Sequence, residues 1–166
     1  AKPPPTNRSE PERVLKRSRT DKQRREWEPH GEGVLLVCDD PDAGELLNRL
    51  MAADGHDVHR VETAEGAVRH LLATPRRAAV LSLSGPTANR QLLEKIRTHP
   101  NPPVSEVAIV LLADDIGAGR EAWENGVDGF LARPFHADQL ATELSGALDR
   151  PLADRQAHRD AQLDAD

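Results

Sequence analysis

Short apolar runs alternate with helical patterns between residues 33 and 149, and this alternation constrains the fold more than any other feature of the sequence. The apolar runs lie at 34–38, 57–61, 78–83, 107–112 and 130–131, and the helical patterns follow them at 42–54, 64–73, 88–98, 117–125 and 137–148. Five consecutive β/α units predict an α/β fold with a doubly wound, five-stranded parallel sheet of order 2-1-3-4-5 and five helices.

The composition fits one domain of this kind with an extension at each end. The chain has 166 residues, of which 37% are hydrophobic and only 2% aromatic, so the core has to be aliphatic. A single cysteine excludes a disulfide within the chain and fits a reducing compartment. The sequence has neither an apolar run of membrane-spanning length nor an apolar signal segment at its start, so we expect a cytoplasmic protein.

Charge separates the N-terminal part from the rest of the chain. Residues 1–30 hold nine Lys and Arg against five Asp and Glu, whereas the remainder holds thirteen against twenty-three. We interpret residues 1–32 as a basic, Pro- and Arg-rich flexible arm or linker. A binding arm around Arg13 to Arg25 is the alternative, but interleaved acidic residues and scarce aromatics argue against a nucleic-acid partner. Residues 150–166 are predicted to be a polar tail that extends the last helix or frays.

The span from about residue 33 to 149 resembles the receiver domains of response regulators, the CheY-like family. The sequence Asp39-Asp40-Pro41-Asp42 is similar to the family's first loop, and the run from Gly126 to Phe135 is similar to its fifth strand. Each piece alone is weak, but the pieces occur in the right order and at matching spacing. The resemblance implies a CheY-like fold and a signalling module of two-component type.

The resemblance also implies which positions would carry phosphoryl transfer, and most of them hold unsuitable residues. The nucleophilic aspartate falls on Ser82, or on Ser84 with a two-residue slip, and neither can form an acyl phosphate. The family's hydroxyl position falls on Leu112, or on Ala113 with a one-residue slip. Together with the first acidic loop and the position of the family's lysine, the degenerate pocket comprises Cys38, Asp39, Asp40, Ser82, Leu112 and Arg133.

We therefore expect no Mg²⁺ site and no cofactor, because Cys38 and Ser82 are poor ligands for a hard cation. Asp39 is left as a weak candidate ligand. We expect Cys38 to be a small buried hydrophobe rather than a redox sensor. Two further hypotheses are that Arg133 pairs with Asp39 across the pocket and that Asp42 caps the first helix.

These residues predict a pseudo-receiver that acts by phosphorylation-independent protein–protein interaction and is not an enzyme. In the family the partner face is formed by the fourth helix, the fifth strand and the fifth helix, here about residues 117–148. Phe130 falls on the family's aromatic switch position, and Trp123 and Phe135 fall within or next to the same face. A histidine kinase, a scaffold or an output domain is the expected partner, and a homodimer is left open. The alternative is a conventional phospho-accepting receiver, or one that responds to a small anion or a metal.

Overall fold

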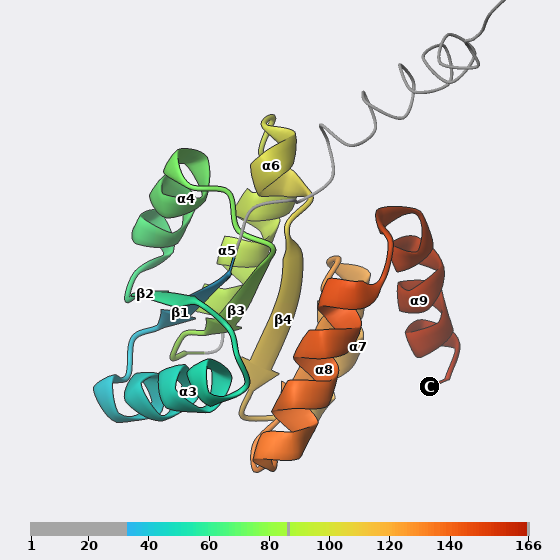
Figure 1. The fold of residues 1–166 in the computed structure, drawn as a ribbon. Helices are drawn as coiled ribbons and strands as arrows, with labels where there is room; N and C mark the ends of the chain where they lie inside the picture. Colours follow the sequence, from blue (N-terminus) through green and yellow to red (C-terminus); the bar gives the residue numbers. More distant parts are fainter. Residues whose placement is uncertain (1–32, 86, 166) are drawn as a thin grey trace, which may run out of the picture.

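A computed structural model describes residues 33–85 and 87–165, and the predicted basic arm lies outside them. All described strands form one parallel sheet of order β2-β1-β3-β4-β5, which confirms the predicted topology (Figure 1). The strands are β1 (Val34–Cys38), β2 (Val58–Val61), β3 (Ala78–Ser82), β4 (Ala108–Ala113) and β5 (Gly129–Ala132).

The five expected helices are present, and three further helical segments join them. The expected ones are α3 (Pro41–Ala53), α4 (Ala64–Ala73), α5 (Ala88–Arg97), α7 (Gly119–Glu124) and α8 (Ala137–Asp149). The additional ones are α6 (Pro102–Ser105), the 3₁₀ helix η1 (Ile116–Ala118) and α9 (Leu152–Asp164). None of the described helices is long and apolar enough to cross a membrane.

The sheet separates two aliphatic cores, as a doubly wound fold requires. Because successive side chains of a strand point to opposite faces, Leu35 and Val37 of β1 pack with residues of α4, α5 and α7. Leu36 and Cys38 pack on the other face with residues of α3 and α8. All five residues of β1 and of β3 are buried, which explains why both read as continuous apolar runs.

Helices α3 and α4 start at side-chain caps. Asp40 Oδ1 accepts hydrogen bonds from the backbone N–H of Asp42 at 3.0 Å and of Ala43 at 3.3 Å. The cap of α3 is therefore Asp40 and not Asp42, because α3 begins at Pro41 and Asp42 already lies in its first turn. Thr63 caps α4 in the same way through the N–H of Gly66.

The segment after residue 149 differs from the expected polar tail. Arg150 has extended backbone angles and Pro151 follows it, so α8 ends at Asp149. A residue that precedes proline is disfavoured in the helical region, and proline lacks the N–H that would continue the helix. The chain then forms the separate helix α9, which packs against α7. The segment thus neither extends α8 nor frays.

Candidate functional site

The candidate site lies where the carboxyl ends of the central strands meet, the usual place for sites in open α/β sheets. Cys38 at the end of β1 is paired in register with Ser82 at the end of β3. Ser82 is only 6% exposed, and its hydroxyl accepts a short hydrogen bond from Nη2 of Arg133. The residue that the resemblance assigns to the phospho-acceptor position is thus a buried serine, bound to the arginine that the resemblance assigns to the lysine position.

Arg133 does not pair with Asp39 as the sequence led us to expect. Its Nη1 lies 3.3 Å from Oδ1 of Asp114 instead. Asp114 follows β4, which is the neighbour of β5, whereas Asp39 follows β1 on the far side of β3. The order of the strands therefore decides which acidic residue Arg133 reaches.

Asp39 is bound by the loop that follows β3. The backbone N–H of Ser84 lies 3.1 Å from both carboxylate oxygens of Asp39, and the Ser84 hydroxyl donates to Oδ1 at 2.8 Å. The backbone and side-chain hydrogen bonds from Ser84 hold the pKa of Asp39 below its usual value. The only carboxylate that matches a metal ligand of the family therefore already has protein donors on both oxygens.

The other residues of the pocket are also bound or buried. Cys38 is fully buried in the core between the sheet and α3, which is the structural role expected for it. Leu112 is fully buried in the same core, where the family would place a hydroxyl. Asp40 caps α3. Across the described part of the chain, no group of three His, Cys, Asp or Glu side chains is placed to hold a metal ion.

Arg60 is a part of this site that the sequence analysis missed. It lies in β2, and its Nη2 is 3.3 Å from the backbone oxygen of Asp40 and 3.5 Å from that of Cys38. Its guanidinium lies directly over Gly44 of α3, where a Cβ atom would approach it to 2.4 Å. An arginine in a short edge strand gave no functional indication because only the fold brings β2 beside the acidic loop.

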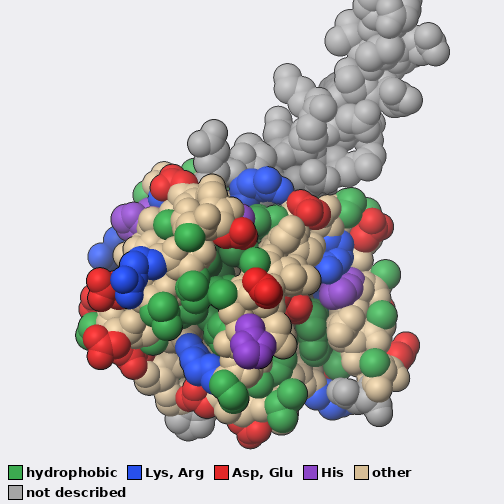
Figure 2. Space-filling view, turned by 60° about the horizontal axis from the view of Figure 1, so that its bottom comes forward, with side chains coloured by type: hydrophobic (Ala, Val, Ile, Leu, Met, Phe, Trp, Pro, Cys, Tyr) green, Lys and Arg blue, Asp and Glu red, His purple; other side chains and the backbone are tan. Residues whose placement is uncertain are grey.

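A cavity of about 460 Å³ opens beside the degenerate pocket, between α5 and the segment that leads from β4 into α7. Its floor includes Leu93 and Leu111, and Arg90, Arg133 and Asp115 are among the charged residues that line it. On the face that contains the carboxyl ends of the strands, acidic and basic side chains are interspersed with apolar ones (Figure 2). The site thus combines an apolar floor with charges of both signs.

The three aromatic residues assigned to the interaction face are distributed unequally. Phe130 is partly buried and packs over α7, where a Cβ atom on Gly119 would lie 3.1 Å from its ring. Phe135 is partly buried against the core under α8. Trp123 is a core residue with 9% exposure, and the ring of His158 from α9 lies edge-on to it at 5.5 Å. Trp123 is therefore covered by α9 and does not offer a free surface.

Comparisons with known proteins identify the fold. No protein-family profile matches the chain. The chain is 27% identical over 136 residues to the nitrogen assimilation regulatory protein NtrX of Azorhizobium caulinodans, an alignment that covers 78% of the chain but only 29% of that protein. It thus spans less than a third of the length of this relative.

Solved receiver domains have the same fold. The receiver domain of NtrX from Brucella abortus has a TM-score of 0.59 and 24% identity, with 71% of this chain and 99% of that chain covered. The receiver domain of a sensor histidine kinase from Pseudomonas aeruginosa, solved with magnesium in its active-site cleft, has a TM-score of 0.63 and 22% identity, with 73% and 100% covered. The described domain therefore has the CheY-like fold of response-regulator receiver domains.

Proposed function

We propose that this chain contains a pseudo-receiver, a signalling module of two-component type that works without accepting a phosphoryl group. The observation that carries the proposal is the pair of Ser82 and Arg133. A buried serine with its hydroxyl bound to an arginine lacks the carboxylate oxygen that forms an acyl phosphate. The fold of receiver domains supports the signalling role, and the altered pocket supports the loss of phosphoryl chemistry.

The hydrogen bonds of Asp39 also support this proposal, because they disfavour the binding of Mg²⁺. Mg²⁺ requires oxygen ligands in near-octahedral geometry and loses its hydration water reluctantly. Asp39 would have to exchange its hydrogen bonds with Ser84 for the ion, and neither Cys38 nor Ser82 supplies a second carboxylate. We accordingly propose that the domain functions without Mg²⁺ or any other cofactor and that it is not an enzyme.

In this proposal the domain acts through a protein partner in the cytoplasm. A histidine kinase, a scaffold or an output domain is the class of partner that the receiver fold favours, with the contact made by α7, β5 and α8. Because no phosphoryl group shifts the conformational equilibrium, the partner itself has to select the active conformation. The similarity to NtrX, whose name describes a regulatory protein, supports a role as one part of a larger regulator.

The small-anion alternative has one observation in its favour. Arg90 and Arg133 both line the cavity beside the degenerate pocket, and two guanidinium groups are suited to bind an oxyanion. Against it, Arg90 lies 3.6 Å from Glu121 and Arg133 binds Asp114, so each arginine already has an acidic neighbour.

The test is an amide NMR titration of the full chain with Mg²⁺, with Mg²⁺ plus beryllofluoride, and with inorganic phosphate, each added separately. We expect no saturable shift at Asp39, Ser82 or Arg133. Asp39→Asn is the matched control, since a shift that persists in this variant does not arise from the pocket. A saturable, Mg²⁺-dependent beryllofluoride shift that Asp39→Asn abolishes would show a functional phosphorylation site and would contradict the proposal. A phosphate shift alone would favour the anion-responsive alternative.

A further inference from the structure

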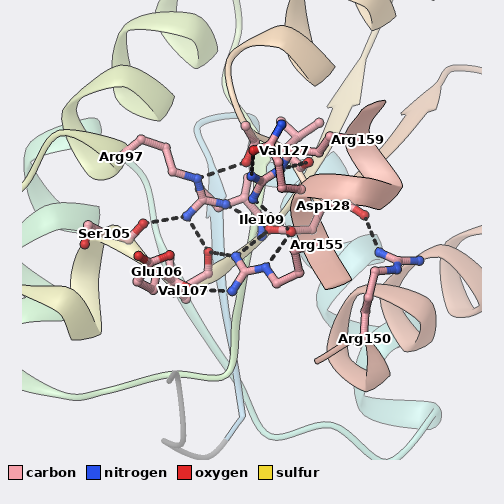
Figure 3. Close-up of polar contacts among 12 residues, drawn as sticks. Arg97, Ser105, Glu106, Val107, Ile109, Val127, Asp128, Arg150, Arg155 and Arg159 are labelled. Atoms are coloured by element: carbon pink, nitrogen blue, oxygen red, sulfur yellow. Dashed lines mark hydrogen bonds and ion pairs between the residues drawn. The ribbon is translucent and has the colours of Figure 1, made fainter. Parts of the chain in front are cut away.

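The most densely bonded polar group among the described residues lies outside the degenerate pocket. It is the carboxylate of Asp128, which stands immediately before β5 and whose side chain is only 1% exposed. The backbone N–H of Ile109 donates to Oδ2 at 2.9 Å. Three arginines surround the same carboxylate: Arg97 from α5 and Arg155 and Arg159 from α9 (Figure 3).

Arg155 makes the central contact between α9 and the domain. Its Nε donates to Oδ1 of Asp128 at 2.7 Å and its Nη2 donates to Oδ2 at 2.9 Å, a bidentate pair. It also donates to the backbone oxygens of Glu106 at 2.7 Å and Val107 at 3.1 Å. With 3% exposure, Arg155 is the only buried residue of α9.

Arg159, one helical turn further on, extends the same contact. Its Nη2 lies 3.2 Å from Oδ1 of Asp128, and its Nε donates to the backbone oxygen of Val127 at 3.1 Å. Residues four apart lie on one face of a helix, so the two arginines reach the carboxylate together. Between them His158 packs edge-on to Trp123. The polar part of the contact face of α9 therefore consists of two arginines and one histidine.

Apolar burial contributes little to the attachment of α9. Apart from alanines, the helix carries only Leu152 and Leu163, and of these Leu163 packs partly against the core. A helix fixed to a domain mainly by charged hydrogen bonds can leave while uncovering little of the core besides Trp123. The strands and the helices α4 and α5 would keep all their mutual contacts.

The surface under α9 is rich in hydrogen-bond acceptors. It presents one buried carboxylate, the backbone oxygens of Glu106, Val107 and Val127, and the indole of Trp123. All of the oxygens accept hydrogen bonds, which suits guanidinium groups. The surface also adjoins α7 and the start of β5, two of the three elements through which the proposed partner would bind.

We propose that α9 is a displaceable cover that occupies, within the same chain, a docking surface for a partner helix with two arginines four residues apart. The inference rests on the proposed function, because it specifies how access to the α7 and β5 side of the interaction face is controlled. The bound arginine pair of α9 shows which chemistry the surface accepts. A partner would compete with α9 for Asp128 and would contact the part of α7 that α9 covers.

The test begins with hydrogen–deuterium exchange on the full chain carrying Arg155→Gln and Arg159→Gln together. We expect amide exchange in residues 152–164 to accelerate at least tenfold while the protection of β1, β3 and β4 stays unchanged. The charge-matched control is Arg49→Gln with Arg69→Gln, two exposed residues of α3 and α4. We expect the control to exchange like the wild type.

The second step adds a synthetic peptide with the sequence of residues 150–165. We expect it to shift the indole resonance of Trp123 in the double variant but not in the wild type, where α9 competes at high effective concentration. The Trp27→Phe background identifies that resonance. A peptide with both arginines replaced by glutamine should leave it unshifted.

Three results would overturn the proposal. Unchanged protection of α9 in the double variant would mean that the arginines do not hold it. Loss of protection in the central strands together with α9 would make the helix an integral part of the fold. Equal binding of the two peptides, or binding of neither, would exclude an arginine-selective surface. None of these readouts involves Mg²⁺ or Ser82, so a failure here is distinct from a failure of the proposed pseudo-receiver.

Discussion

Replacement of Asp128 by asparagine tests the physical basis of the buried ionic cluster. Burial by itself would raise the pKa of Asp128, but the hydrogen bond from Arg155 and the charges of Arg97, Arg155 and Arg159 outweigh it and keep the pKa below its usual value. Burial also lowers the pKa of Arg97, to about 10, with the charges of the other two arginines acting in the same direction and Asp128 opposing them. The carboxylate is thus the group that compensates the buried Arg155 and the two partly exposed arginines beside it.

The expected loss follows from the charges left behind. Asparagine has nearly the same shape, but it leaves the buried Arg155 and the largely buried Arg97 without the Asp128 carboxylate. Its amide N–H groups would also face other donors. Removing one partner of a buried ion pair costs about 3–5 kcal/mol. Against a typical unfolding free energy of about 5–15 kcal/mol, this is a large fraction of the stability of the domain. We expect the melting temperature to fall by about 10 °C or more.

The measurement is urea unfolding followed by far-UV circular dichroism, with Asp160→Asn as the control. Asp160 is exposed on α9 and contacts Gln156, so its replacement should change the unfolding free energy by less than about 0.5 kcal/mol. The contribution of ionised Asp128 to the unfolding free energy is fully present above its unfolded pKa near 3.8. It is lost as the pH falls through the lower pKa of the folded state. Asp128→Asn should therefore remove part of the acid sensitivity. A loss below about 1 kcal/mol would refute this account of the cluster.

Three further predictions concern the pocket, α9 and α4. Ser82→Asp alone should not restore Mg²⁺-dependent beryllofluoride binding, because Leu112 still lacks a hydroxyl; saturable shifts by NMR would contradict this. Burial, followed by the charge of Arg150, lowers the pKa of His158, so docking of α9 should be strongest above pH 6.5 and weaken as the pH falls through the folded pKa. The measurement is the hydrogen-exchange protection factors of residues 152–164 between pH 7 and 5. They would show no such trend if His158 stays solvated. Thr63→Ala should cost about 1 kcal/mol in urea unfolding through loss of the α4 cap, and a neutral result would mean that water replaces the cap.

The sequence alone predicted the fold because the periodicity of apolar residues is a local property. The runs at β1, β3 and β4 are continuous since both of their faces are buried, and the helices between them repeat their apolar residues with helical spacing. The meeting of the carboxyl ends of β1 and β3 also followed from the sequence. The carboxyl ends of parallel strands meet at one edge whatever the details of packing, so Cys38 and Ser82 had to become neighbours.

The partners of the charged residues were decided by the tertiary structure. Arg133 binds Asp114 rather than Asp39, and Arg60 reaches the first loop, because strand order and loop geometry set these distances. No periodic pattern records which two charges will meet.

The same reason explains why the sequence predicts a polar tail where the structure has α9. Its sequence is hydrophilic, and hydrophilic ends usually remain solvated. Arg155 is nevertheless buried, because it binds the carboxylate of Asp128, which is 27 residues away in the sequence and lies directly before β5. Sequence periodicity reports apolar burial and therefore determined the sheet and its two cores. A helix buried through ion pairs carries no such pattern, and only the folded structure brings its partner into reach.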